Sequence, residues 1–325
     1  MAKPGKLDRF DAFIPSDPWV NPWQADGSYE SDFRLLVSLL DVAVGTSQRS
    51  GVVAGAADVW AAEELRRAGF DPDEVWPRRS APRVLSRDLR NFVDLALTKS
   101  LREQVADRFD KPGARRALPA EAHIMGRAYS KQSDVVIASW PAGVEVLIST
   151  KTMLSSYQKN LRNRFEEGYG DAKNIRGRHP LASLGFLFIA GADIPDTSLT
   201  FAIDMLRKLT SEEDVYDCAC LLVVDGAEGS KEEEERDGRP VEEEPAALLS
   251  LRRGPIDEGD EAEDDAHEDG RSPGTLSGSV WVIRDRVPPD LDADHFFSVL
   301  ISSALDRMPI AVYPEVRHRR ASVGS

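Results

Sequence analysis

The segment 133–151 constrains the fold most, because it predicts a β-hairpin. Two runs rich in β-branched residues flank the turn-forming residues Trp, Pro, Ala and Gly at 140–143. If these four residues form the loop, strand pairing places Asp134 opposite Ser149. Side chains alternate between the two faces of a strand, so Lys151 lies on the same face as Ser149. We therefore expect an acid, a hydroxyl and an amine at one end of the hairpin.

This arrangement resembles the PD-(D/E)XK nucleases, the restriction-endonuclease-like superfamily, in which an Asp begins one strand and an acid-X-Lys triplet ends the next. Asp134 matches the Asp, and residues 149–151 match the triplet, with Ser149 in place of the acid. Some restriction enzymes of the superfamily also carry Ser there and take the missing acid from the following helix. The resemblance covers about residues 89–190. It implies an α/β fold, a restriction-endonuclease-like core with a central mixed β-sheet flanked by helices.

The resemblance implies hydrolysis of DNA phosphodiester bonds with Mg²⁺ (or Mn²⁺), by a catalytic set of Asp134, Ser149, Lys151 and Glu166. Asp134 and Glu166 would bind the metal, since hard divalent cations prefer carboxylate oxygens. Lys151 would orient the attacking water and stabilise the charged phosphorus centre. Glu166 is preferred because it shares a helix face with Gln158 and Arg162. Other candidate metal ligands are Glu167, Glu145 and Glu121.

The helix after the hairpin is rich in amide and guanidinium groups, which suit contact with phosphates. We expect this helix to end near Gly168, followed by a basic loop at 171–180. Such a loop could follow a phosphate backbone. The predicted nucleic-acid-binding residues are Gln158, Lys159, Arg162, Arg164, Lys173, Arg176 and Arg178.

The charge of the chain is concentrated in one segment. A formal net charge of -15 alone argues against a protein that binds polyanions. Residues 225–270, however, hold 19 acidic and 5 basic residues, a net charge of -14, so the rest of the chain carries only -1. This segment is of low complexity and poor in aromatic residues, which predicts a disordered insertion. The remaining chain can therefore present a local basic surface.

Helical and buried-strand patterns alternate along the chain, as in α/β proteins. We expect helices over 31–46 and 56–68, a long helix that begins after Ser86, and a strand over 123–131 before the hairpin. The predicted parts are an N-terminal helical accessory region (1–85), a nuclease-like α/β core (86–227), the acidic disordered insertion (228–273), a strand and helix that complete the core (274–312) and a mobile tail (313–325).

No apolar run reaches the roughly 18 residues that a membrane-spanning helix needs. The start of the chain lacks the apolar stretch of a signal peptide. We therefore expect a soluble cytoplasmic protein without membrane partners. Cys218 and Cys220 lie in an apolar run at a spacing that suits neither a disulfide nor a zinc site, so we interpret them as reduced core residues.

Three roles are compatible with these patterns. The favoured role, by family analogy alone, is a type II-like restriction or phage-defence endonuclease that acts on DNA, with a homodimer expected for double-strand cleavage. The alternative is a catalytically inactive nuclease-fold protein that serves as a nucleic-acid-binding or interaction module in a larger complex, which the missing triplet acid supports. A third is a nuclease subunit that acts with defence-system partner proteins.

Overall fold

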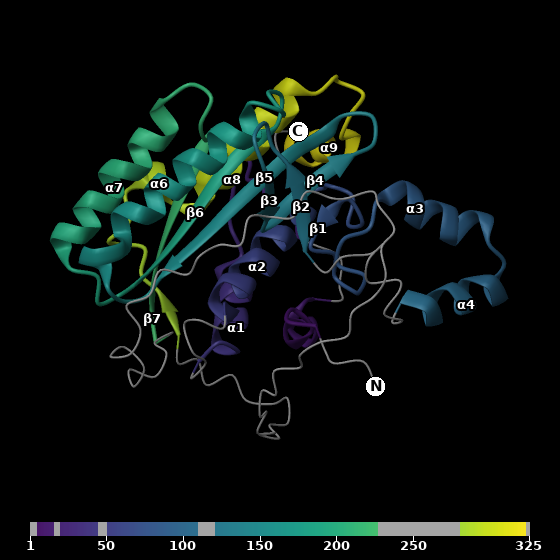
Figure 1. The fold of residues 1–325 in the computed structure, drawn as a ribbon, viewed down its shortest axis with the longest axis horizontal. Helices are drawn as coiled ribbons and strands as arrows, with labels where there is room; N and C mark the ends of the chain where they lie inside the picture. Colours follow the sequence, from purple (N-terminus) through teal and green to yellow (C-terminus); the bar gives the residue numbers. More distant parts are fainter. Residues whose placement is uncertain (1–4, 16–19, 45–50, 110–120, 227–279, 323–325) are drawn as a thin grey trace. The chain divides into compact units, whose positions relative to one another are not determined.

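The computed structural model describes residues 5–15, 20–44, 51–109, 121–226 and 280–322. The acidic insertion predicted at 228–273 lies outside the described residues. The protein is an α/β protein with a six-stranded mixed, curled sheet packed with helices, together with N-terminal helices (Figure 1). Within the described part of the chain, no helix is long and apolar enough to cross a membrane.

The main sheet has the strand order β1-β4-β5-β6-β7-β8, in which β5, β6 and β7 run parallel and the other neighbours are antiparallel. Its strands are β1 (Val75–Trp76), β4 (Val135–Ser139), β5 (Gly143–Met153), β6 (Ser183–Gly191), β7 (Cys218–Asp225) and β8 (Trp281–Val282). A separate antiparallel pair consists of β2 (Ala122–Met125) and β3 (Ser130–Ser133). The described α-helices are α1 (Phe33–Asp41), α2 (Val52–Ala68), α3 (Arg87–Asn91), α4 (Lys99–Phe109), α6 (Tyr157–Arg176), α7 (Asp196–Ser211), α8 (Ala293–Arg307) and α9 (Pro314–Ala321).

Two hydrophobic clusters cover the two faces of the main sheet. Helices α1, α2 and α8 pack on one face, toward which Ile148 of β5 points. Helices α6 and α7 pack on the other face, toward which Leu147 points. The crossovers β5-α6-β6 and β6-α7-β7 lie on the same face, as connections of one handedness between parallel strands require. The N-terminal region, expected to be accessory, therefore supplies part of one layer of the core, together with α8.

The β4–β5 pairing agrees with the predicted register at one end and differs at the other. Val135 pairs with Ile148, and continuing this register places Asp134 opposite Ser149, as expected. At the turn, Ser139 pairs with Gly143 instead of Val144, so the loop has three residues rather than four. A bulge at Glu145 absorbs this difference, because it adds one residue to β5 between the turn and the site.

In the N-terminal region the predicted start of the first helix and the predicted end of the second are confirmed, whereas α1 ends at Asp41 rather than 46 and α2 begins at Val52 rather than 56. Asp32 caps α1 by accepting hydrogen bonds from two backbone N–H groups. Helix α2 ends at Gly69, whose φ of 108° lies in the left-handed region that favours glycine. The strands and helices predicted after the hairpin, including β6, β7 and α8, are also present.

Helix α6 does not end near Gly168 but continues to Arg176, so most of the predicted basic loop is helical. Gly168 has a packing role there rather than a helix-ending one. A Cβ atom at this position would lie 2.7 Å from Cε2 of Phe186 on β6, so glycine allows the helix to approach the strand closely. The free energy gained by burying the apolar side of α6 outweighs the low helix propensity of glycine.

Three other expectations need correction. The long helix after Ser86 is interrupted, because α3 passes into a π-helical turn at Phe92–Ala96 and α4 starts anew. Residues 123–131 form parts of β2 and β3 and the turn between them, not one strand. The tail predicted to be mobile contains α9, whose Val316 is buried in the core, and its last residues 323–325 lie outside the described residues.

Two glycines of α6 provide a matched test of this packing. Gly170→Ala should raise the free energy of unfolding by about 0.5–1 kcal/mol, because alanine favours helix and a Cβ there meets nothing within 4 Å. Gly168→Ala should lower it by about 1–3 kcal/mol, because the buried Phe186 ring must move. Urea denaturation of both variants measures the difference. Equal changes in the two variants would contradict this packing.

Candidate functional site

Asp134 lies just before β4, and its carboxylate is held against β5. The Thr150 N–H donates a hydrogen bond of 2.8 Å to Asp134 Oδ2. This bond fixes the carboxylate at the level of the 149–151 triplet. Burial raises the pKa of Asp134 to about 6, despite the hydrogen bond from Thr150 and the positive charges of Lys151 and Lys131.

The ammonium group of Lys151 on β5 faces helix α6. Its Nζ lies 3.7 Å from Glu167 Oε2 and 3.9 Å from Asp171 Oδ2. These two acids are four residues apart, so they share one face of the helix. The Asp171 side chain is only 10% exposed, whereas that of Glu167 is 47% exposed. Glu166 is exposed on α6, and the glutamate that the structure brings to Lys151 is Glu167 instead.

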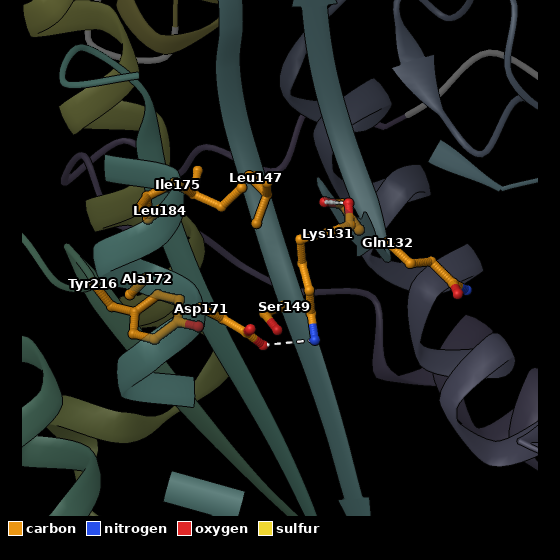
Figure 2. A pocket seen from close by; sticks show the side chains of 10 residues that line it. Lys131, Gln132, Leu147, Ser149, Asp171, Ala172, Ile175, Leu184 and Tyr216 are labelled. Carbon is orange, nitrogen blue, oxygen red and sulfur yellow. Dashed lines mark hydrogen bonds and ion pairs between the residues drawn. The ribbon is translucent and has the colours of Figure 1, made fainter. Parts of the chain in front are cut away.

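Ser149 is buried and lines a small cavity of about 10 Å³, close to the smallest space that holds one water molecule. Lys131 of β3, Asp171 of α6 and Tyr216 line the same cavity. Figure 2 shows Lys131 and Asp171 meeting beside Ser149, with 2.9 Å between Nζ and Oδ2. Burial lowers the pKa of Lys131, but the Asp171 carboxylate outweighs burial and leaves this pKa raised.

Asp58 of α2 approaches Asp134 from the other layer of the core. Burial and the Asp134 carboxylate raise the pKa of Asp58 well above its usual value. The Asp58 Oδ1 and Thr150 Oγ1 atoms are buried, and neither has a hydrogen-bond partner within the described residues. The Thr150 hydroxyl is nevertheless close enough to offset part of the rise in the Asp58 pKa. Asp58 and Asp134 thus form a second group of polar atoms beside the triplet.

Acids and bases alternate in the site. Asp58, Asp134, Glu167 and Asp171 are accompanied by Lys131 and Lys151, by Arg164, which pairs with Glu167, and by Lys6, whose charge lowers the pKa of Asp58. A divalent cation prefers carboxylate oxygens as ligands. Asp134 and Asp58 are the pair that could share it. The described residues contain no group of three or more His, Cys, Asp or Glu side chains placed to hold a metal, so carbonyl groups and water would complete the shell.

Two other acids proposed from the sequence lie elsewhere. Glu145 was a candidate metal ligand, but the bulge turns it toward the layer opposite Ser149 and Lys151, where its buried carboxylate accepts a hydrogen bond from the Tyr313 hydroxyl. Glu121 is exposed immediately before β2.

The basic residues of α6 fall into two groups. Arg176 was predicted to contact nucleic acid, but it is buried and donates to the Val215 carbonyl and to Asp217, so its guanidinium stabilises the fold. Lys173 donates to the Glu213 carbonyl. Exposed guanidinium groups at or near α6 belong to Arg162, Arg164 and Arg178, and Arg164 pairs with Glu167. The side chains of Gln158 and Lys159 lie outside the described part of the chain.

Sequence reasoning missed Asp58, Lys131 and Asp171. Asp171 follows Glu167 by one helical turn, so the helical spacing would have revealed it if the glycines at 168 and 170 had not suggested an earlier end. Asp58 lies in an otherwise apolar helical run, which marks it as an unusual buried acid. No local pattern distinguishes Lys131 from a solvated lysine of a hairpin.

Comparisons with protein-family models, with curated proteins and with solved structures found no match. The site consists of a carboxylate, a hydroxyl and an amine at the ends of β4 and β5, bordered by acids from α2 and α6. It defines an α/β protein with a charged, partly buried site at one end of its sheet.

Asp134→Asn should increase stability at neutral pH, because the amide oxygen can still accept the Thr150 hydrogen bond without a buried charge. The folded-state pKa of about 6 exceeds the unfolded value of about 3.9. The native state therefore binds more protons between these values and loses stability as pH rises through them. The gain should reach about 1–3 kcal/mol at pH 8 and vanish below about pH 4.

Urea denaturation of wild type and Asp134→Asn between pH 4 and 8 measures this effect. The exposed Asp107 of α4 provides the control, because Asp107→Asn removes one carboxylate without removing a buried one. A gain in stability that does not depend on pH would contradict the role of burial at Asp134.

Proposed function

We propose that this protein is a Mg²⁺-dependent DNA endonuclease of the PD-(D/E)XK type. The observation that carries this proposal is the hydrogen bond of 2.8 Å from the Thr150 N–H to Asp134 Oδ2, which keeps the carboxylate beside the triplet that ends in Lys151. The resemblance implies this relation between an Asp before one strand and a Lys near the end of the next. The mixed sheet with helices on both faces also fits it.

Each charged group then has a role in phosphodiester hydrolysis. Asp134 and Asp58 hold the cation, because both are acids whose charge is unfavourable without one. Mg²⁺ (or Mn²⁺) would supply the positive charge that activates water and stabilises the reacting phosphate. Lys151 orients the attacking water and balances charge that develops on the phosphate oxygens. Ser149 offers a hydroxyl opposite Asp134 and two residues before Lys151 on β5.

DNA is the proposed substrate because exposed guanidinium groups lie along and beyond α6, the helix that borders the site. Arg162 and Arg178 are exposed, and Arg164 is 43% exposed. Such groups bind phosphates through charge and paired hydrogen bonds. A type II-like restriction or phage-defence role, a homodimer and defence-system partners follow from family analogy alone.

One observation favours a second function, that of an inactive nuclease-fold protein acting as a nucleic-acid-binding or interaction module. Within the described residues no three potential ligand side chains converge on one point. Glu167 and Asp171 also neutralise Lys151 in part. A protein of this kind would bind DNA through its basic groups and leave the phosphodiester bonds intact.

Cleavage of plasmid DNA distinguishes the two functions. Purified protein with Mg²⁺ or Mn²⁺ should nick or cut supercoiled plasmid, and Asp134→Ala or Lys151→Ala should each lower the rate by about 100-fold or more, as expected when a group that stabilises developing charge is lost. Asp58→Asn should raise the Mg²⁺ concentration needed for half-maximal rate. Binding without cleavage by the wild type would support the inactive alternative, and equal rates in the variants would rule out this site.

The neighbouring glutamates of α6 test which acid belongs to the site. Glu167→Gln should lower the cleavage rate by about 3–10-fold, because the charge that holds the Lys151 ammonium group in place, 3.7 Å away, is lost. Glu166→Gln should change the rate by less than about twofold, because the side chain is exposed. Initial rates at saturating Mg²⁺ measure both. A larger loss of rate in Glu166→Gln than in Glu167→Gln would instead assign the site acid to Glu166, the residue predicted from the sequence.

A further inference from the structure

The hairpin of β2 and β3 places a second lysine beside the triplet. Lys131 Nζ lies 2.9 Å from Asp171 Oδ2, whereas Lys151 Nζ lies 3.9 Å from the same oxygen atom. The two ammonium groups thus compete for one carboxylate oxygen, and Lys131 is the closer (Figure 2 shows the Lys131–Asp171 pair). Like charges repel, so an ammonium group already at Asp171 opposes the approach of another.

The hairpin is firmly attached to the helix that carries Asp171. Asn174, one turn beyond Asp171, accepts hydrogen bonds from the Ala128 and Tyr129 N–H groups and donates one to the Tyr129 carbonyl. Gly126 allows this contact, since a Cβ there would lie 2.2 Å from Asn174 Nδ2. The position of Lys131 relative to α6 is therefore fixed by the backbone.

The same hairpin also contacts the second oxygen of Asp171. The Tyr129 hydroxyl donates to Oδ1 at 3.4 Å, while Lys131 pairs with Oδ2. Asp171 is thus held from one side by the hairpin, and Lys151 reaches it from the other. The charge of Asp171 is balanced without a short ion pair to Lys151.

We propose that Lys131 is a positioning residue, which occupies Asp171 so that the ammonium group of Lys151 stays available to the substrate phosphate. This inference rests on the proposed nuclease function. Without the charge of Lys131, Asp171 attracts Lys151 and draws its Nζ closer than 3.9 Å. A displacement of about 1 Å at a reacting centre is enough to slow a reaction by up to about 100-fold.

The test compares single and double variants of the whole chain by plasmid cleavage. Lys131→Met should lower kcat about tenfold while KM changes less than about twofold, because the displacement affects Lys151 and not DNA binding. Lys131→Arg keeps the charge and should stay within about threefold of wild type. The double variant Lys131→Met with Asp171→Asn should be faster than Lys131→Met alone, because the carboxylate that captures Lys151 is gone.

Lys208→Met is the matched control, since this lysine pairs with Asp204 on the exposed side of α7 and its loss should leave kcat unchanged. A double variant as slow as, or slower than, Lys131→Met would overturn the proposal. So would a reduced rate in Lys131→Met that Lys131→Arg shares.

A crystal structure of Lys131→Met gives a readout that does not depend on cleavage. The distance from Lys151 Nζ to Asp171 should shorten from 3.9 Å to about 3 Å, the length of a direct ion pair. An unchanged distance would overturn the positioning role. If the wild type does not cleave DNA, the nuclease proposal fails, while this distance still decides whether Lys131 keeps Lys151 from Asp171.

Discussion

The site depends on β5, a central strand that is covered on both faces. Its side chains are buried in an unbroken run from Val144 to Thr150, between the layer of α2 and the layer of α6. A strand in this position normally carries apolar residues throughout. Ser149, Thr150 and Lys151 interrupt that pattern, and each polar group must find a partner or remain unsatisfied. The Thr150 hydroxyl has no hydrogen-bond partner within the described residues, whereas its backbone N–H binds Asp134, and Lys151 pairs with the acids of α6.

These partners are charged groups in a partly buried place, so they reduce stability. Burial raises the pKa of Asp134 to about 6, and burial together with the Asp134 carboxylate raises the pKa of Asp58, which means that ionising either group at neutral pH costs free energy. Apolar residues would pack there without that cost. Charged groups that reduce the stability of the folded protein in this way are typical of functional sites, where they bind or act on a ligand.

Local sequence patterns predicted the two strands of the hairpin and the pairing of Asp134 with Ser149. The alternation of side chains and the turn residues that determine this pairing all lie within about twenty positions. The turn was predicted one residue too long, yet the bulge at Glu145 restored the register at the site. Contacts between distant segments could not be predicted. Asp58 reaches the site because α2 packs on the sheet, and Lys131 because Asn174 ties its hairpin to α6.

The position of Asp171 gives a physical reason for the small side chain at Ser149. The cavity beside Ser149 measures about 10 Å³, and Asp171 lines it from α6. A longer acidic side chain at 149 would have to fill this cavity and would place another carboxylate next to Asp171 and Asp134, where the negative charge of Asp171 already helps to raise the pKa of Asp134. An acid at 149 would therefore add a third carboxylate to this small space. Serine at this position leaves the cavity beside Asp171 open.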